Sequence, residues 1–256
     1  MRSRRRFWLA TSVAIGSLVV SGCAPSGALP ELEGLPGRIS GQLGQRGVVI
    51  AAPHGNSDAR TGEIAAELGR RTGFGVVIAT GFNLEPDTRD RPGRRYQVNR
   101  PFEGTPGQPP SEDAASEGAR QVYRAFEQRV REVAQGPLVF YVEIHGNNHR
   151  DAVNQIEIAT VGVDRDEAAR LRTLLELIRD AYLRANREAP RLEILVEPAN
   201  PVRYAASGAK RDGILRLPQR ALHIELPKAA RTEWRETYIA ILADFLVQAV
   251  TPPTGK

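Results

Sequence analysis

The sequence contains a single cysteine, Cys23, among 256 residues. An internal disulfide framework is therefore excluded, and the fold must be stabilised by a buried apolar core. The apolar, uncharged stretch of residues 7–20 is too short to span a bilayer comfortably. The chain also lacks a basic face interleaved with aromatic residues, so nothing in it indicates nucleic-acid binding.

Residues 1–22 have the features of an export signal. A Ser-Arg-Arg-x-Phe motif precedes the apolar stretch and resembles a twin-arginine signal. The small residues before Cys23 resemble the lipobox of bacterial lipoproteins. We therefore expect a lipid on Cys23 that anchors the mature chain to a membrane of a bacterial cell envelope, with residues 23–45 as lipidated cysteine and tether. The signal carries four arginines and no acid, so its removal lowers the formal net charge from +5 to +1.

Strand-like and helix-like segments alternate through residues 46–256. This pattern predicts a single α/β domain, with a mostly parallel or mixed sheet and helices on both faces. Residues 84–111, rich in proline, glycine and arginine, are expected to form a long irregular excursion. The expected strands are 47–52, 75–79, 138–144, 155–161, 192–196 and 221–226, and the expected helices are 61–71, 112–134, 164–186 and 232–250.

Two of the expected strands end in a histidine followed by glycine. His54 and His145 occupy these positions, and open α/β sheets place their sites at the carboxyl ends of the strands. Two carboxylates, Asp58 and Glu63, follow His54 closely. Imidazole and carboxylate are ligands of zinc, so the pattern predicts a metal site with His54 and His145. Either Asp58 or Glu63 could supply the third ligand.

Further acids lie beside these histidines. Glu143 shares the side of the strand that carries His145, so it could orient that ring or serve as a structural carboxylate. His223 and Glu225 share one side of the last strand, and Glu225 could take a proton from a water molecule activated by the metal. His149 falls in a loop, where an exposed position is expected.

An arginine-rich segment within the excursion is a candidate carboxylate-binding site. It includes Arg95, Asn99 and Arg100, and arginine grips carboxylates through two parallel hydrogen bonds. A solvated loop is the alternative interpretation.

The order of these motifs resembles that of the N-formylglutamate amidohydrolase-like family, within the zinc carboxypeptidase-like hydrolases. The motifs are Pro-His-Gly-x-x-Asp, Thr-Gly-Glu-Ile, Arg-Tyr-x-x-Asn-Arg-Pro, a strand ending in His-Gly, and Ile-Glu. The resemblance implies a phosphorylase/hydrolase-like α/β fold and one zinc per chain, held by two histidines and a carboxylate. It assigns ligand roles to His54, His145 and, by preference, Asp58, with Glu63 as the alternative. Substrate binding falls to Asn99 and Arg100, with Arg95 a further candidate, and Glu225 becomes the base.

The expected function is therefore a zinc-dependent amidohydrolase. Its substrate would be a small carboxylated peptide or N-acyl amino acid, such as a formylglutamate-like compound, a γ-glutamyl peptide or a peptidoglycan stem. One alternative is a non-catalytic lipoprotein that binds a carboxylated ligand through Arg100. Another is a structural envelope protein, although packing alone does not require His-Gly at two strand ends.

The lipobox interpretation predicts the fate of a Cys23→Ala variant. Because a lipid on Cys23 would be its membrane anchor, this variant should move from the membrane fraction to the soluble fraction with its fold unchanged. Fractionation followed by circular dichroism measures both properties. A variant that still sediments with membranes would contradict the lipobox.

Overall fold

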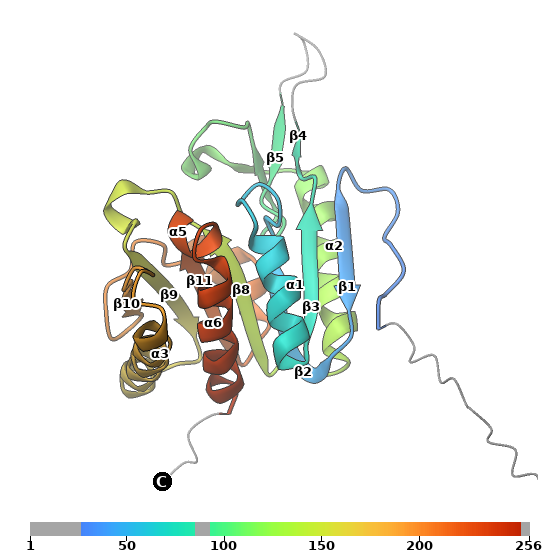
Figure 1. Ribbon diagram of the computed structural model, residues 1–256. Coiled ribbons are helices and arrows are strands. Elements are labelled where there is room, and N and C mark those ends of the chain that lie inside the picture. The colour runs from blue at the N-terminus through green and yellow to red at the C-terminus, as the bar shows by residue number, and fades with distance from the viewer. Residues whose placement is uncertain (1–26, 85–92, 252–256) are drawn as a thin grey trace, which may run out of the picture.

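The computed structural model in Figure 1 describes residues 27–84 and 93–251, so the predicted signal and Cys23 lie outside the described residues. A seven-stranded mixed sheet runs in the order β1-β3-β2-β8-β11-β9-β10. Its strands are β1 (Arg38–Gln42), β2 (Gln45–Ala52), β3 (Phe74–Thr80), β8 (Phe140–Gly146), β9 (Gln155–Val161), β10 (Glu193–Val196) and β11 (Arg220–Leu226).

The centre of this sheet is parallel. Strands β3, β2, β8 and β11 run in the same direction, whereas β1 pairs with β3, and β9 with β11, in antiparallel fashion. Parallel strands are covered by helices on both faces, which is why β2 and β3 are almost continuous apolar runs, whereas β8 and β11 also carry buried polar residues. Because these four strands are neighbours, their carboxyl ends meet at one edge of the sheet.

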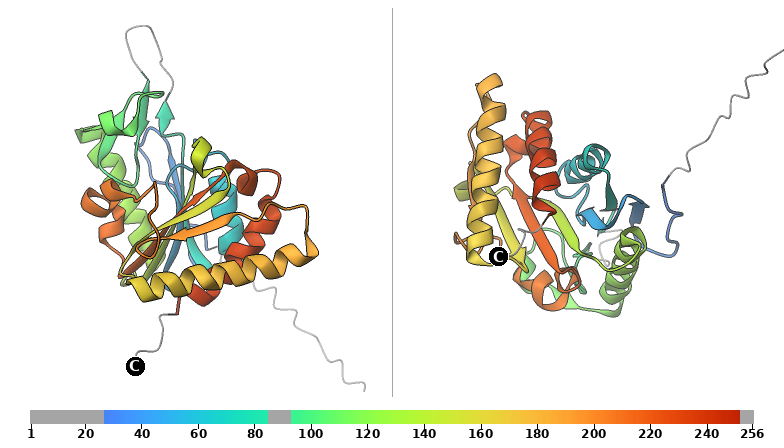
Figure 2. Two further views of the ribbon diagram at one scale, coloured as in Figure 1. Left: turned by 90° about the vertical axis from the view of Figure 1, so that its left-hand side faces the viewer. Right: turned by 90° about the horizontal axis from the view of Figure 1, so that it is seen from below.

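Helices cover both faces of the sheet, as Figure 2 shows, and the predicted α/β architecture is confirmed. One face is covered by α1 (Thr61–Thr72), α3 (Arg165–Ala185) and α6 (Arg235–Ala249), and the other by α2 (Glu117–Ala134). Ser116 and Asp164 cap the amino ends of α2 and α3, each accepting a hydrogen bond from a backbone N–H. None of the described helices is long and apolar enough to cross a membrane.

The predicted excursion contains regular structure. A small antiparallel sheet is formed by β4 (Asn83–Leu84), β5 (Arg94–Tyr96), β6 (Phe102–Gly104) and β7 (Ala114–Ala115). Its β4–β5 pair projects from the end of the molecule toward which β3 points (Figure 1). Short helices occur at α4 (Ser207–Asp212) and α5 (Lys228–Arg231), with 3-10 turns at Pro110–Glu112, Arg150–Ala152 and Ile214–Arg216.

The expected tether over residues 23–45 is wrong in its second half. Residues 38–42 form β1, and its Ile39 side chain is fully buried against the α2 side of the sheet. The buried Arg129 of α2 also donates a hydrogen bond to the Pro30 carbonyl, at 2.6 Å. The domain therefore begins well before residue 46.

This correction predicts that Ile39→Ala will destabilise the domain. Removing a fully buried isoleucine side chain should lower the free energy of unfolding by about 2 to 5 kcal/mol. Leu43, in the same segment but 37% exposed, provides the matched control, and Leu43→Ala should cost less than about 0.5 kcal/mol. Urea unfolding measures the free energy of unfolding of both variants. Equally small losses in the two would support the original interpretation of residues 23–45 as a tether outside the domain.

Candidate metal centre and active site

Three neighbouring strands deliver the candidate site residues to one edge of the sheet. His54 follows the end of β2, His145 lies near the end of β8, and Glu225 near the end of β11. The parallel register of β8 and β11 places Glu225 directly beside His145. Along β11, alternation sends Leu222, Ile224 and Leu226 into the core under α1, α3 and α6, while His223 and Glu225 face the other side.

A buried arginine fastens the loops that follow these three strands. Arg231, 1% exposed, donates hydrogen bonds to the carbonyl oxygens of Ala59, Asn147 and Leu226 at 2.9–3.0 Å. Its guanidinium also explains the glycine after His145, because a Cβ atom at Gly146 would lie 2.5 Å from the Arg231 Cζ. The Arg231 guanidinium therefore binds backbone oxygens at or after the ends of β2, β8 and β11.

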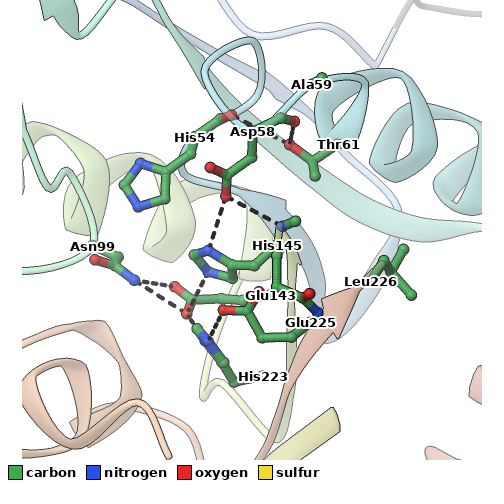
Figure 3. A network of polar contacts seen from close by, with 12 residues as sticks. His54, Asp58, Ala59, Thr61, Asn99, Glu143, His145, His223, Glu225 and Leu226 are labelled. Carbon is green, nitrogen blue, oxygen red and sulfur yellow. Dashed lines mark hydrogen bonds and ion pairs between the residues drawn. The ribbon is translucent and has the colours of Figure 1, made fainter. Parts of the chain in front are cut away.

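His54, Asp58 and His145 form a cluster at the open side of this edge (Figure 3). Asp58 Oδ2 lies 3.4 Å from His145 Nδ1 and accepts a hydrogen bond from the Gly146 N–H, and the rings of His54 and His145 have centroids 5.2 Å apart. Two ligands about 2 Å from a tetrahedral zinc are separated by about 3.3 Å, so Asp58 and His145 already have ligand spacing.

The electrostatics of the cluster suit a cation. Burial lowers the pKa of His54, which favours the neutral imidazole that metals bind. Burial alone would raise the pKa of Asp58, but the hydrogen bond to His145 and nearby imidazoles outweigh it and lower that pKa to about 2. Burial likewise opposes protonation of His145, yet hydrogen bonds to Asp58 and Glu143 raise its pKa to about 10. Asp58 and Glu143 thus supply negative charge on both sides of the His145 ring.

A second cluster shares His145 and extends through His223 to the fully buried Glu143. Ligand atoms of Glu143, His145 and His223 lie within 4.8 Å of one another, so these three residues could also hold a metal. Glu143 is fully buried, and its carboxylate faces His145 Nε2 at 3.3 Å and His223 Nδ1 at 2.9 Å. The Tyr141 hydroxyl and the Asn99 amide also donate hydrogen bonds to it, so both of its oxygens are occupied.

The two clusters differ in their access to the cavity. A catalytic ion needs an open coordination position. His54, Asp58 and His145 all line a cavity of about 470 Å³, whereas of the second cluster His145 and His223 line it and Glu143 does not. Glu143 is closed off from that cavity and contacts the nitrogen of His145 that faces away from Asp58. This is the arrangement in which a carboxylate orients a metal-binding histidine, one of the roles expected for Glu143.

Residues of the arginine-rich segment line the same cavity. Arg95, Asn99 and Arg100 line it, as do Glu225 and Tyr204. Arg95 is bound internally, to Asp113 and to the Gln108 carbonyl at 2.6 Å each. Asn99 turns its amide N–H toward Glu143. The Arg100 side chain, by contrast, donates no hydrogen bond within residues 27–84 and 93–251, and its nearest carboxylate is Asp113 at 3.7 Å.

Two residues named in the sequence analysis lie elsewhere. Glu63, the alternative third ligand, has a side chain 61% exposed on α1 and forms ion pairs with Arg60 and Arg235. Because these contacts turn it away from the cavity, Asp58 is the carboxylate that the fold brings to the two histidines. His149 is exposed and accepts a hydrogen bond from the Asp151 N–H, as expected of a loop residue.

Sequence reasoning missed the contribution of three residues. His223 joins Glu143 to Glu225, Arg231 ties the loops, and Tyr204 lines the cavity. Backbone N–H groups of Arg203 and Tyr204 donate to the buried Glu157, which fixes this part of the cavity wall. The signal for His223 was its place two residues before Glu225 on one strand face; Tyr204 follows an irregular stretch and had none.

Comparison with known proteins gives limited similarity. No family model matches the chain, and no curated protein matches its sequence. Among solved structures, bacteriophage poly-γ-glutamate hydrolase is similar over 86% of this chain and 90% of its own, with 13% identity and a TM-score of 0.46. A metallo-carboxypeptidase from Burkholderia cenocepacia is similar over 90% of this chain and 64% of its own, with 14% identity and a TM-score of 0.46. Similarity at this level carries no functional assignment, which therefore depends on the side chains described above.

The geometry predicts which variants lose metal. His54→Ala, Asp58→Asn and His145→Ala should each bind much less than one zinc per chain, because each removes a ligand facing the cavity. Glu63→Gln and His149→Ala are matched controls and should keep the metal. Elemental analysis of protein purified without chelator gives the result, with circular dichroism to verify folding. Full zinc content in His54→Ala would instead favour the second cluster of Glu143, His145 and His223.

Proposed function

We propose that this protein is an exported, lipid-anchored zinc amidohydrolase that cleaves an amide bond in a carboxylate-bearing substrate. The observation that carries the proposal is the meeting of His54, Asp58, His145 and Glu225 on one cavity wall with Arg100 in the same cavity. A candidate metal site, a candidate base and a guanidinium in one cavity are the components that hydrolysis of such an amide requires.

His54, Asp58 and His145 hold the zinc in this proposal. When bound, the ion supplies Lewis-acid activation of water and of the scissile carbonyl. Glu225 Oε1 contacts His223 Nε2 at 3.2 Å, whereas Oε2 has no hydrogen-bond partner among the residues that the structure describes. Glu225 therefore accepts the proton of the attacking water at Oε2 and returns it to the leaving nitrogen.

Arg100 binds the substrate carboxylate. Its guanidinium is partly buried, packs over the Phe102 ring at 5.7 Å and lines the cavity, and within residues 27–84 and 93–251 its only carboxylate contact is with Asp113 at 3.7 Å. Two glycines pack against the Arg100 side chain. A Cβ atom at Gly208 would lie 2.0 Å from Arg100 Nη1, and one at Gly213 would lie 3.0 Å from Arg100 Cβ. This packing fixes the direction of the guanidinium, which favours a two-point contact with a carboxylate.

The export signal and lipobox support an envelope location and a substrate met outside the cytoplasm. A γ-glutamyl peptide or a peptidoglycan stem fits this location better than a cytoplasmic formyl-amino acid. The rival function is a lipoprotein that binds a carboxylated ligand in the same cavity without cleaving it. The position of Glu225 beside His145 favours the enzyme.

The proposal predicts different kinetic defects in two variants. Glu225→Gln retains the shape of the side chain but cannot accept a proton, so kcat should fall by about 10² to 10⁴-fold with zinc still bound. Arg100→Lys should raise KM, because an ammonium group cannot reproduce a bidentate contact, while kcat changes less.

N-formyl-L-glutamate and L-γ-glutamyl-L-glutamate are suitable probes for this comparison. Calorimetry with each probe first establishes binding to the wild type, and zinc analysis accompanies each variant. Binding without turnover in the wild type would favour the non-catalytic lipoprotein. Loss of zinc in Glu225→Gln would make Glu225 a ligand rather than a base.

A further inference from the structure

We propose that His223 is a positioning residue that fixes the orientation of Glu225 by linking it to the buried Glu143. The inference builds on the proposed function, in which Glu225 is the base. His223 lies two residues before Glu225 on β11, so both side chains leave the same face of the strand. His223 Nε2 lies 3.2 Å from Glu225 Oε1, and His223 Nδ1 lies 2.9 Å from Glu143 Oε2 (Figure 3).

A glutamate base at the edge of a cavity needs such a contact. Its side chain has several rotatable bonds, and a hydrogen bond to one carboxylate oxygen selects one rotamer among them. His223 engages Oε1, which leaves Oε2 as the oxygen available to water in the cavity. Within residues 27–84 and 93–251, no other side chain forms a hydrogen bond with Glu225, so its orientation depends on His223.

The orientation of His223 is in turn fixed by the buried Glu143. Each of its ring nitrogens faces a carboxylate oxygen, so the ring cannot turn without losing one of the two contacts. Glu143 is fully buried, and the Tyr141 hydroxyl at 3.1 Å and the Asn99 amide at 3.3 Å fix it. The orientation of Glu225 is therefore set by a chain of contacts that begins in the protein core.

The positioning role of His223 has a metal-ligand role as its alternative. Ligand atoms of His223, Glu143 and His145 lie within 4.8 Å of one another, so His223 could instead contact a metal in that cluster. The positioning role requires the Nε2 contact, and the ligand role requires zinc to depend on His223. Zinc content and turnover therefore distinguish the two.

A pair of amide variants tests the inference. Glutamine places its amide nitrogen near the position of imidazole Nε2, and asparagine near that of Nδ1. His223→Gln should keep the donor toward Glu225, whereas His223→Asn should keep only the contact with Glu143. We expect about one zinc per chain in both, similar KM values, and a kcat about 10- to 100-fold lower in His223→Asn than in His223→Gln, as expected for one hydrogen bond to a charged group.

Two further measurements sharpen the test. In a Glu225→Gln background, His223→Asn should have little additional effect on kcat, because a residue that acts through Glu225 has nothing left to position. Crystal structures of the two single variants should show one Glu225 rotamer in His223→Gln and several in His223→Asn. His149→Gln, an exposed histidine outside the cavity, is the control and should match the wild type throughout.

Three outcomes would overturn the inference: equal kcat in the two single variants, an ordered Glu225 in both crystal structures, or loss of zinc from both. Thermal unfolding of each variant verifies that the comparison is between folded proteins. The crystal structures also separate this inference from the proposed function. If the wild type cleaves neither glutamate probe while Glu225 is ordered only when residue 223 donates to it, the enzyme proposal fails and the positioning role stands.

Discussion

The geometry of the site depends on the buried guanidinium of Arg231. It binds the carbonyl oxygens that follow Asp58, His145 and Glu225 in the chain, those of Ala59, Asn147 and Leu226. Burial lowers the pKa of Arg231, and the negative charges of Asp58 and Glu225 oppose this effect. A cation buried in this way is stable only because its N–H groups are paired, so the loops and the guanidinium hold one another in place. The spacing of Asp58, His145 and Glu225, which lie just before these carbonyl groups in the chain, is a consequence of these contacts.

A second constraint is the column of polar side chains on one face of two central strands. Tyr141, Glu143 and His145 follow one another on β8, and His223 and Glu225 lie beside them on β11. The opposite face of both strands is apolar apart from Arg220 at the start of β11, so the core beneath α1, α3 and α6 supplies stability without these residues. Hydrogen bonds within a buried polar network fix its geometry, because a residue that moved would leave its partner unpaired. The column therefore gives rigidity to the part of the sheet from which the cavity-facing residues project.

Much of this arrangement followed from the sequence by simple rules. Apolar runs predicted the strands, and two runs ending in His-Gly placed His54 and His145 at the same sheet edge because parallel strands share a direction. The sequence did not distinguish Asp58 from Glu63, since the turn before α1 decides which carboxylate points to the cavity. It also failed to predict β1, a five-residue strand with glycine and polar residues whose partner β3 lies far along the chain. His223 and Arg231 were not assigned because their partners are set by register and packing, with Glu143 80 residues away from His223.

Strand register explains why the residues proposed as base and metal ligand lie side by side. Glu225 and His145 are direct neighbours on adjacent parallel strands, and such strands are about 4.8 Å apart. Side chains of the two residues leave the same face of the sheet, so they converge on the cavity from neighbouring positions. The loop after β2 then needs only to bring His54 and Asp58 over the end of β8, which the contact between Asp58 and the Gly146 N–H achieves. Backbone hydrogen bonds of the sheet thus fix the positions of His145 and Glu225, whereas those of His54 and Asp58 depend on a loop. In the proposed function, this division keeps the geometry of the site constant while substrates enter and leave.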